Sequence, residues 1–232
     1  MILNSRKTKC IPFNNSLTKD FIPRFSVGQD QLEVVYKLKL VGLVLNSELT
    51  WDSHIDYTVG RVNKVLWQLT RFRQHGADRK KLIQFYILKI RSILMFGAVC
   101  FHSSLTKEHS RQLELQQKRS LACLLGSDYQ NYNNALSVTS LTRLDTLREE
   151  ACLKWAIKAE TNPQHSHLFP VNPSVINTRF RKLFKEYNCK GSEFYDSAVP
   201  SMVRALNNHY TQLGSNIGEV TVTTNSGIVT TV

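Results

Sequence analysis

Residues 40–55 constrain the fold most, because a strand signal, a turn signal and a helix start follow one another there without a gap. Residues 41–45 are apolar and partly β-branched, which favours a buried strand. Asn46-Ser47-Glu48 then has turn chemistry, and Asp52 or Ser53 offers a side-chain oxygen to cap a helix. Apolar residues recur after this cap at spacings of three and four: Ile55, Val59, Val62, Leu66 and Leu69. The sequence therefore predicts a strand, a turn and an amphipathic helix over residues 53–74.

The same periodicity predicts three further helices, over residues 79–97, 107–125 and 142–160. Thr106 is placed to cap the second of them, and Gly126 is placed to end it. The third should be capped around Thr142 and should end at Asn162-Pro163, because proline cannot continue a helix.

Residues 1–46 show no helical periodicity and predict strands and loops. One short strand is expected over residues 10–13, and a hairpin is expected between residues 34–36 and 40–45. The predicted fold class is mainly α, with short N-terminal strands and a hairpin, then a basic helical bundle, then a loosely structured C-terminal tail. The expected domains span residues 1–46, 47–126, 127–210 and, for a flexible tail, 211–232.

The net charge of +12 is concentrated in the first half of the chain. Residues 1–126 hold 20 Lys and Arg against 9 Asp and Glu, whereas residues 127–232 hold 10 against 9. Within residues 61–91, nine basic residues stand against one acid, Asp78. Such a density of one sign repels itself unless a polyanion lies nearby, so we expect the segment to contact nucleic acid.

Arg61 and Lys64 lie off the apolar stripe of the first predicted helix, and Lys80, Lys81 and Lys89 mostly lie off that of the second. The candidate nucleic-acid-binding residues are Arg61, Lys64, Arg71, Arg73, Lys80, Lys81, Lys89 and Arg91. Trp67, Phe72 and Tyr86 are interleaved with them and could stack on bases, but we expect these three aromatics to be core residues instead.

Two blocks of this sequence resemble a known family. The first is Leu40-Val41-Gly42 with Leu49-Thr50-Trp51-x-x-His54-Ile55, and the second is Asn4-x-x-Lys7-Thr8. Both look like segments that follow the catalytic strands in reverse transcriptases of non-LTR (LINE-type) retrotransposons. Looser similarity continues to about Asn207, through residues 82–97 and 113–117 among others.

The resemblance implies the end of a polymerase palm, a thumb and a following helical region, which would hold an RNA or DNA template-primer duplex or the element's own RNA. The two Mg²⁺ ions of such a polymerase are bound by carboxylates that include an Asp-Asp pair. This sequence contains no Asp-Asp pair, and Asp78 is better explained as a helix cap. We therefore predict no catalytic residue and no cofactor in this chain, and no polymerase activity for the chain alone.

Lys7 is the residue that the resemblance would place beside the nucleotide, where an ammonium group could neutralise departing pyrophosphate. An ordinary surface lysine at the start of a strand is the alternative. No metal site is predicted, because Cys100-x-His102 and His165-x-His167 are isolated pairs without a second half.

Five cysteines with no repeated spacing favour reduced thiols inside a cell. No leader is evident at Met1, and the longest apolar tract, residues 92–101, is too short to span a bilayer. We expect a soluble intracellular protein without membrane contact, and the resemblance would place it in the nucleus. Two alternatives remain open: an independent nucleic-acid-binding protein derived from a retrotransposon, and a helical protein-interaction scaffold. The sequence does not indicate an oligomeric state.

Overall fold

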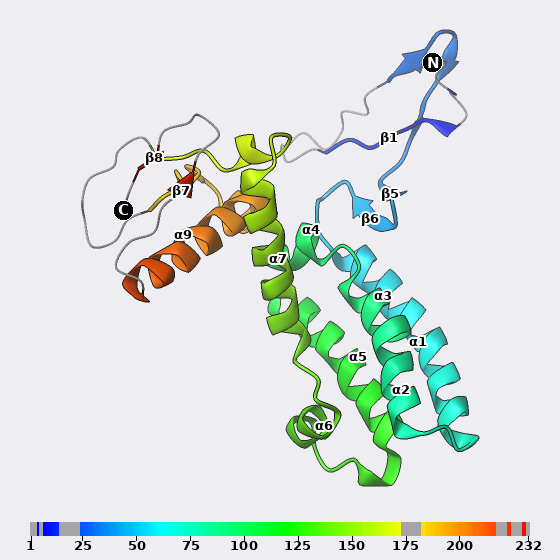
Figure 1. Cartoon of the computed structure of the whole chain (residues 1–232). Coiled ribbons are helices and arrows are strands. Elements are labelled where there is room, and N and C mark those ends of the chain that lie inside the picture. The colour runs from blue at the N-terminus through cyan, green and yellow to red at the C-terminus, as the bar shows by residue number, and fades with distance from the viewer. Residues whose placement is uncertain are drawn as a thin grey trace. The chain divides into compact units, whose positions relative to one another are not determined.

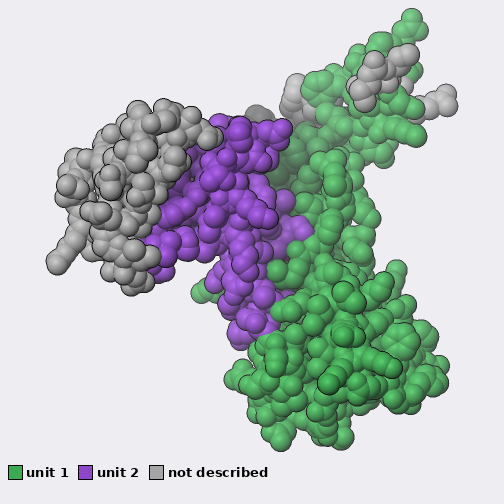
Figure 2. Space-filling model, viewed as in Figure 1, with its two compact units in different colours: residues 1–96, 105–141 green, residues 97–104, 142–232 purple. Residues whose placement is uncertain are grey.

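The structure is a computed structural model that describes residues 4, 7–13, 24–172, 182–216, 222–223 and 229–230. The chain forms two compact units, which Figure 2 shows in different colours. Unit 1 contains residues 1–96 and 105–141, and unit 2 contains residues 97–104 and 142–232. Helices dominate both units (Figure 1), which confirms the mainly α prediction.

The helices of unit 1 pack around α1 (Asp52–Gln74), which lies against α5 (Lys107–Leu125). On another side α1 contacts a second helical segment built from α2 (Arg79–Phe85), η2 (Tyr86–Arg91) and α3 (Ser92–Met95). The short α6 (Tyr132–Thr139) follows the 3-10 turn η4 (Gly126–Asp128) and contacts α5. Side chains from all three long segments form the core: Ile55, Val62, Leu69, Leu82, Tyr86, Ile90, Leu94, Leu113 and Leu121.

The ends of these helices follow the predicted signals with one exception. Thr106 accepts a hydrogen bond from the backbone N–H of His109 (3.1 Å), and α5 ends before Gly126, as expected. Helix α1 begins instead after Trp51, and no side chain caps it. The prediction that Asp52 or Ser53 caps α1 was wrong because both residues lie inside the first turn, where Asp52 Oδ1 is 2.8 Å from His109 Nε2 of α5.

The helix predicted over residues 79–97 is interrupted by a π-helical turn, η2. Tyr86, its first residue, is fully buried, and its hydroxyl donates a hydrogen bond to Gln117 of α5. Gln117 in turn donates to the hydroxyl of Tyr132 (2.9 Å), which donates to Glu114. Burial raises the pKa of Tyr86, so this hydroxyl stays protonated and acts as a donor inside the core.

The N-terminal hairpin differs in register from the predicted one. Strands β5 (Lys37–Leu40) and β6 (Leu43–Asn46) pair antiparallel, with Leu40 opposite Leu43. The two-residue turn is Val41-Gly42, and both residues have positive φ angles of 47° and 91°. The turn therefore falls inside the strand expected over residues 40–45, because Gly42 readily adopts a conformation that a tight hairpin needs.

Residues 33–34 take a different partner from the one expected. Strand β4 (Glu33–Val34) pairs parallel with β1 (Lys9–Cys10), and Lys9 forms an ion pair with Glu33 (3.0 Å). Between them, β2 (Ser26–Val27) and β3 (Asp30–Gln31) form a small hairpin.

Unit 2 is built on α7 (Leu144–Thr161) and α9 (Ala198–Asn216). The segment formed by α4 (Ala98–Phe101) and η3 (His102–Ser104) contacts both helices. Shorter elements are η5 (Ser166–Leu168) and α8 (Ser192–Tyr195). The core contains Ala156, Ala159, Phe169, Phe184, Met202, Val203 and Leu206.

The sequence did not predict α6 or α9 as separate helices. Helix α7 begins at Leu144 without a side-chain cap and ends at Asn162-Pro163, close to the prediction. Helix α9 extends to Asn216, into the predicted tail, and residues 222–223 pair with residues 229–230 as β7 (Val222–Thr223) and β8 (Val229–Thr230). The rest of the predicted tail lies outside the described residues.

Among the described residues, one helical stretch, Arg79–Ser104, is long and apolar enough to cross a membrane. It contains Ile90 and Leu94 of the unit 1 core, together with the charged Lys89 and Arg91. The chain also turns at Phe96-Gly97 before α4 begins. A single stretch of this kind, interrupted by a turn and carrying charged residues, is weak evidence for a membrane span.

Candidate nucleic-acid interface

One face of α1 presents a row of basic residues with an aromatic ring among them. Arg61, Lys64, Trp67 and Arg71 follow one another at spacings of three and four, so they share one side of the helix. All four are exposed, whereas Val62 and Leu69 on the other side are fully buried. We call these four residues the α1 stripe.

Trp67 is 63% exposed, so the prediction that it is a core residue was wrong. The guanidinium carbon of Arg71 lies over its ring, 5.4 Å from the ring centroid. The physical reason for the exposure is helix geometry: Trp67 precedes the buried Leu69 by two residues, about 200° around the helix.

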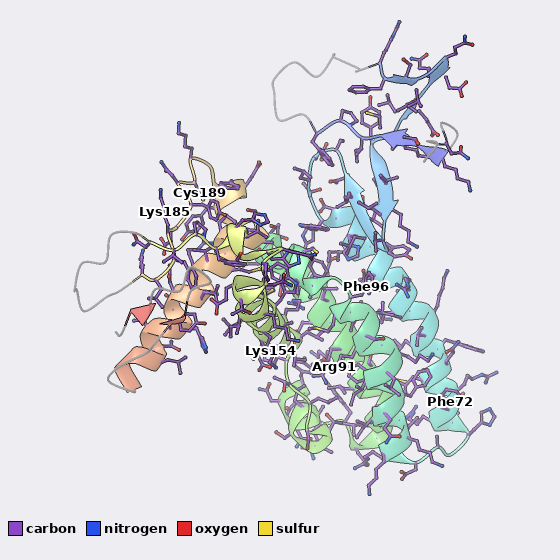
Figure 3. All side chains as sticks on the ribbon, turned by 45° about the horizontal axis from the view of Figure 1, so that its top comes forward. Phe72, Arg91, Phe96, Lys154, Lys185 and Cys189 are labelled. Carbon is purple, nitrogen blue, oxygen red and sulfur yellow. The ribbon has the colours of Figure 1, made fainter. Side chains whose placement is uncertain are left out.

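The other two interleaved aromatics have different environments. Phe72 is 47% exposed, which also contradicts the core prediction, and it meets Phe85 of α2 edge to face at 5.0 Å. Figure 3 shows Phe72 near the C-terminal end of α1. Tyr86 is fully buried, as expected.

A lysine of the hairpin extends the α1 stripe at its N-terminal end. Lys39 of β5 donates a hydrogen bond to the hydroxyl of Tyr57 (2.6 Å), and its ammonium lies 4.6 Å from the centre of that ring. Arg61 approaches the same ring at 5.7 Å. The hydrogen bond from Lys39 lowers the pKa of Tyr57. Lys39 of the hairpin and Arg61 of α1 thus place two cations at one tyrosine ring.

Sequence reasoning missed Lys39. Its available signal was the Lys37-x-Lys39 alternation, which places both lysines on one face of a strand. The pairing with Tyr57 across 18 residues has no local signal.

The remaining candidate residues do not join the α1 stripe. Arg73 is exposed but lies about 200° from Arg71 around the helix. Its guanidinium packs instead against Gly126, so closely that a methyl group added at this glycine would clash with Nη1. Lys80 and Lys81 are exposed in the first turn of α2, and Lys89 and Arg91 lie in η2, where Arg91 is half-buried.

None of the eight candidate residues belongs to an ion pair within the described part of the chain. Asp128 pairs with Arg79, and Glu108 pairs with Arg111 at 2.7 Å. Asp56, which precedes Arg61 on α1, forms no ion pair with any of the eight in this part of the chain. Asp78 accepts a hydrogen bond from the backbone N–H of Lys80 (3.2 Å), which confirms it as the cap of α2. The residues that the structure describes therefore leave the charge of the α1 stripe unneutralised.

Lys7 lies in a turn that the Asn-x-x-Lys-Thr segment builds for itself. The backbone N–H of Lys7 donates to the carbonyl oxygen of Asn4 (3.1 Å) and lies 3.3 Å from its Oδ1. The hydroxyl of Thr8 donates to the same carbonyl (2.8 Å). This local bonding accounts for the Asn and Thr of the pattern, and the Lys7 side chain is exposed.

The described residues contain no group of three or more His, Cys, Asp or Glu side chains that could hold a metal ion. Cys10, Cys100, Cys123, Cys152 and Cys189 all carry free thiols. Fold and surface together define a mainly α protein with an exposed face of cations and one indole. No family model matches the chain, and neither a curated protein nor a solved structure matches it.

Proposed function

We propose that this chain binds nucleic acid through the α1 stripe, as the thumb-containing piece of a LINE-type reverse transcriptase. The observation that carries the proposal is the line of exposed, unneutralised cations Arg61, Lys64 and Arg71 on one rigid helix. Ten residues separate the first from the last, about 15 Å along the helix axis. Phosphates of one duplex strand advance by about 3.4 Å along the duplex axis, so the α1 stripe could reach several of them.

The role proposed for this surface is positional. The cations would hold the phosphate backbone of a template-primer duplex, or of the element's RNA, without reading sequence. In a complete polymerase this grip would keep the primer end aligned beside the palm, which contributes to rate by fixing geometry. The chain alone would bind nucleic acid and would not polymerise. Because such an element integrates into chromosomes, we place this activity in the nucleus.

The test reverses the charge of Arg61, Lys64 and Arg71 to Glu and measures affinity for an RNA–DNA hybrid by fluorescence anisotropy. Three phosphate contacts predict that wild-type affinity falls about 40-fold between 50 and 200 mM salt. The triple variant should lose both the affinity and most of this salt dependence.

A matched control reverses three exposed lysines elsewhere, Lys118, Lys158 and Lys185, which gives the same change in net charge. This control should retain at least a third of the wild-type affinity at 200 mM salt. Equal losses in the two triple variants would mean that only net charge matters. Binding of a protein partner that does not depend on salt would favour the interaction-scaffold alternative.

A further inference from the structure

Trp67 is the feature of the α1 stripe that phosphate binding leaves unexplained. The chain has three tryptophans, and the other two are partly buried against neighbours. Trp51 meets His54 edge to face at 5.8 Å, and Trp155 packs on Phe169 and His165. Trp67 instead exposes 63% of its surface in the middle of a row of cations. Single exposed apolar side chains are common on protein surfaces, so what distinguishes Trp67 is its place between Lys64 and Arg71 in a row of cations.

The ring is held by the residue that follows it by one turn. Arg71 places its guanidinium over the indole at 5.4 Å from the ring centroid, so one side of the ring is covered by a planar cation. Lys64 lies one turn before the ring, on the same face. Seven residues separate Lys64 from Arg71, about 10 Å along the axis, with Trp67 between them.

We propose that Trp67 stacks on an unpaired nucleobase, so that the ligand of the α1 stripe includes a single-stranded segment. This inference rests on the proposed binding of nucleic acid and specifies the class of ligand. A base inside a duplex is covered on both faces by its neighbours, whereas an unpaired base offers a free π face to an aromatic ring. The phosphates on either side of that base would then lie within reach of Lys64 and Arg71.

Charge complementarity selects nucleic acid over other planar or apolar ligands. An apolar peptide would gain from the indole but would have to desolvate the neighbouring cations without neutralising them. A nucleotide strand supplies both partners in alternation, a base for the ring and a phosphate for each cation.

The experiment uses the full chain and two probes of equal length, a single-stranded oligo-dT and a blunt-ended DNA duplex without loops or overhangs. Binding of the single-stranded probe should quench the tryptophan fluorescence of the protein. This quenching should disappear in Trp67→Phe. Trp67→Ala should weaken single-strand binding by about five- to 150-fold, the range found for loss of one base–aromatic stack, and duplex binding by less than twofold. Trp67→Phe should keep most of the affinity because a phenyl ring still stacks.

Phe194→Ala is the control, since Phe194 is 50% exposed in unit 2 and lies outside the α1 stripe. It should leave both affinities unchanged. Three outcomes would overturn the stacking role: equal losses for single strand and duplex in Trp67→Ala, no loss for either, or a quench that survives in Trp67→Phe. In those cases salt-dependent binding by the wild type would still support the proposed function. Absence of salt-dependent binding to either probe would instead contradict the proposed function itself.

Discussion

Two cations of α1 differ in what surrounds them. Lys64 is exposed on the α1 stripe, whereas Arg73 points its guanidinium at Gly126. We predict that Lys64→Gln reduces the salt slope of nucleic-acid binding by about 1, and that Arg73→Gln leaves it nearly unchanged. Anisotropy titrations at four salt concentrations would measure both slopes. A larger effect of Arg73→Gln would move the interface to the opposite side of α1.

His102 gives unit 2 a dependence on pH. Its Nδ1 accepts a hydrogen bond from Nε of the fully buried Arg148 (3.4 Å). Burial, followed by the charge of Arg148, lowers the pKa of His102 to about 4, and Asp145 opposes this only in part. A histidine in an unfolded chain has a pKa of about 6.5, so the unfolded state binds the proton first as the solution is acidified.

Acidification therefore lowers the stability of unit 2. The stability contributed by neutral His102 is complete above about pH 6.5 and is lost as the pH falls toward 4. We predict a loss of about 2 kcal/mol between pH 7.5 and pH 5. Urea unfolding of the wild type and of His102→Asn, which keeps an acceptor near the Nδ1 position, would measure it. Identical pH profiles for the two proteins would contradict the prediction.

At the scale of single elements, two glycines of unit 1 should respond in opposite ways to the same substitution. Gly60 lies inside α1 with open space around the position of a Cβ atom. Gly126 ends α5 with φ 59° and ψ −120°, a conformation reserved for glycine, and faces Arg73. We predict that Gly60→Ala stabilises the protein by about 0.5–1 kcal/mol and that Gly126→Ala destabilises it by about 1–3 kcal/mol.

Thermal unfolding followed by circular dichroism would measure both changes. The Arg73 side chain can move away from an added methyl group, so the cost at Gly126 should come mainly from the backbone. The double variant Gly126→Ala with Arg73→Ala should therefore remain destabilised. Full recovery in the double variant would assign the cost to the clash instead.

The elements that the sequence predicts well have both periodicity and a local end signal. Helix α5 has Thr106 at one end and Gly126 at the other, and its bounds agree with the prediction. Helix α9 lacks such signals, because Pro200 stands in its first turn and suggests a loop. Its stability depends on distant contacts, such as Asn207, whose side-chain amide bonds both backbone groups of Phe184 (2.9 and 3.0 Å). No local pattern encodes that pairing.

The candidate site also combines features that the local sequence predicts with features that depend on distant contacts. Residue type and density were enough to select Arg61, Lys64 and Arg71. The offset of Arg73 from Arg71 was visible in the sequence, but its contact with Gly126 required the position of α5. Trp67 was assigned to the core because aromatic residues usually lie there, although its offset of two from Leu69 was visible in the sequence. Lys39 joins the cluster only through the register of the β5–β6 hairpin.

On the scale of the whole molecule, the two units do not correspond to consecutive halves of the chain. Residues 97–104 leave unit 1, belong to unit 2, and return to unit 1 at residue 105. Val99 packs against the unit 2 core, and α4 contacts α7 and α9.

We therefore predict that unit 1 folds alone when residues 97–104 are replaced by eight Gly and Ser residues and the chain is ended at 141. The fragment 142–216 should fail to fold, because it lacks the segment that covers part of its core. Circular dichroism and heating would show a cooperative transition for the first fragment and none for the second. Cooperative unfolding of the second fragment would show that α4 is dispensable for unit 2.

Because residues 97–104 belong to unit 2 but lie between two parts of unit 1, they are synthesised before the helices that they pack against. When the ribosome has made residue 141, every residue of unit 1 exists, but the helices that cover α4 do not. Val99 must wait for α9, about 100 residues later, which takes about 5–20 s at ordinary translation rates. During that interval the apolar segment 97–104 stays exposed on the nascent chain after all residues of unit 1 have been made. Exposed apolar segments of this kind are what chaperones bind.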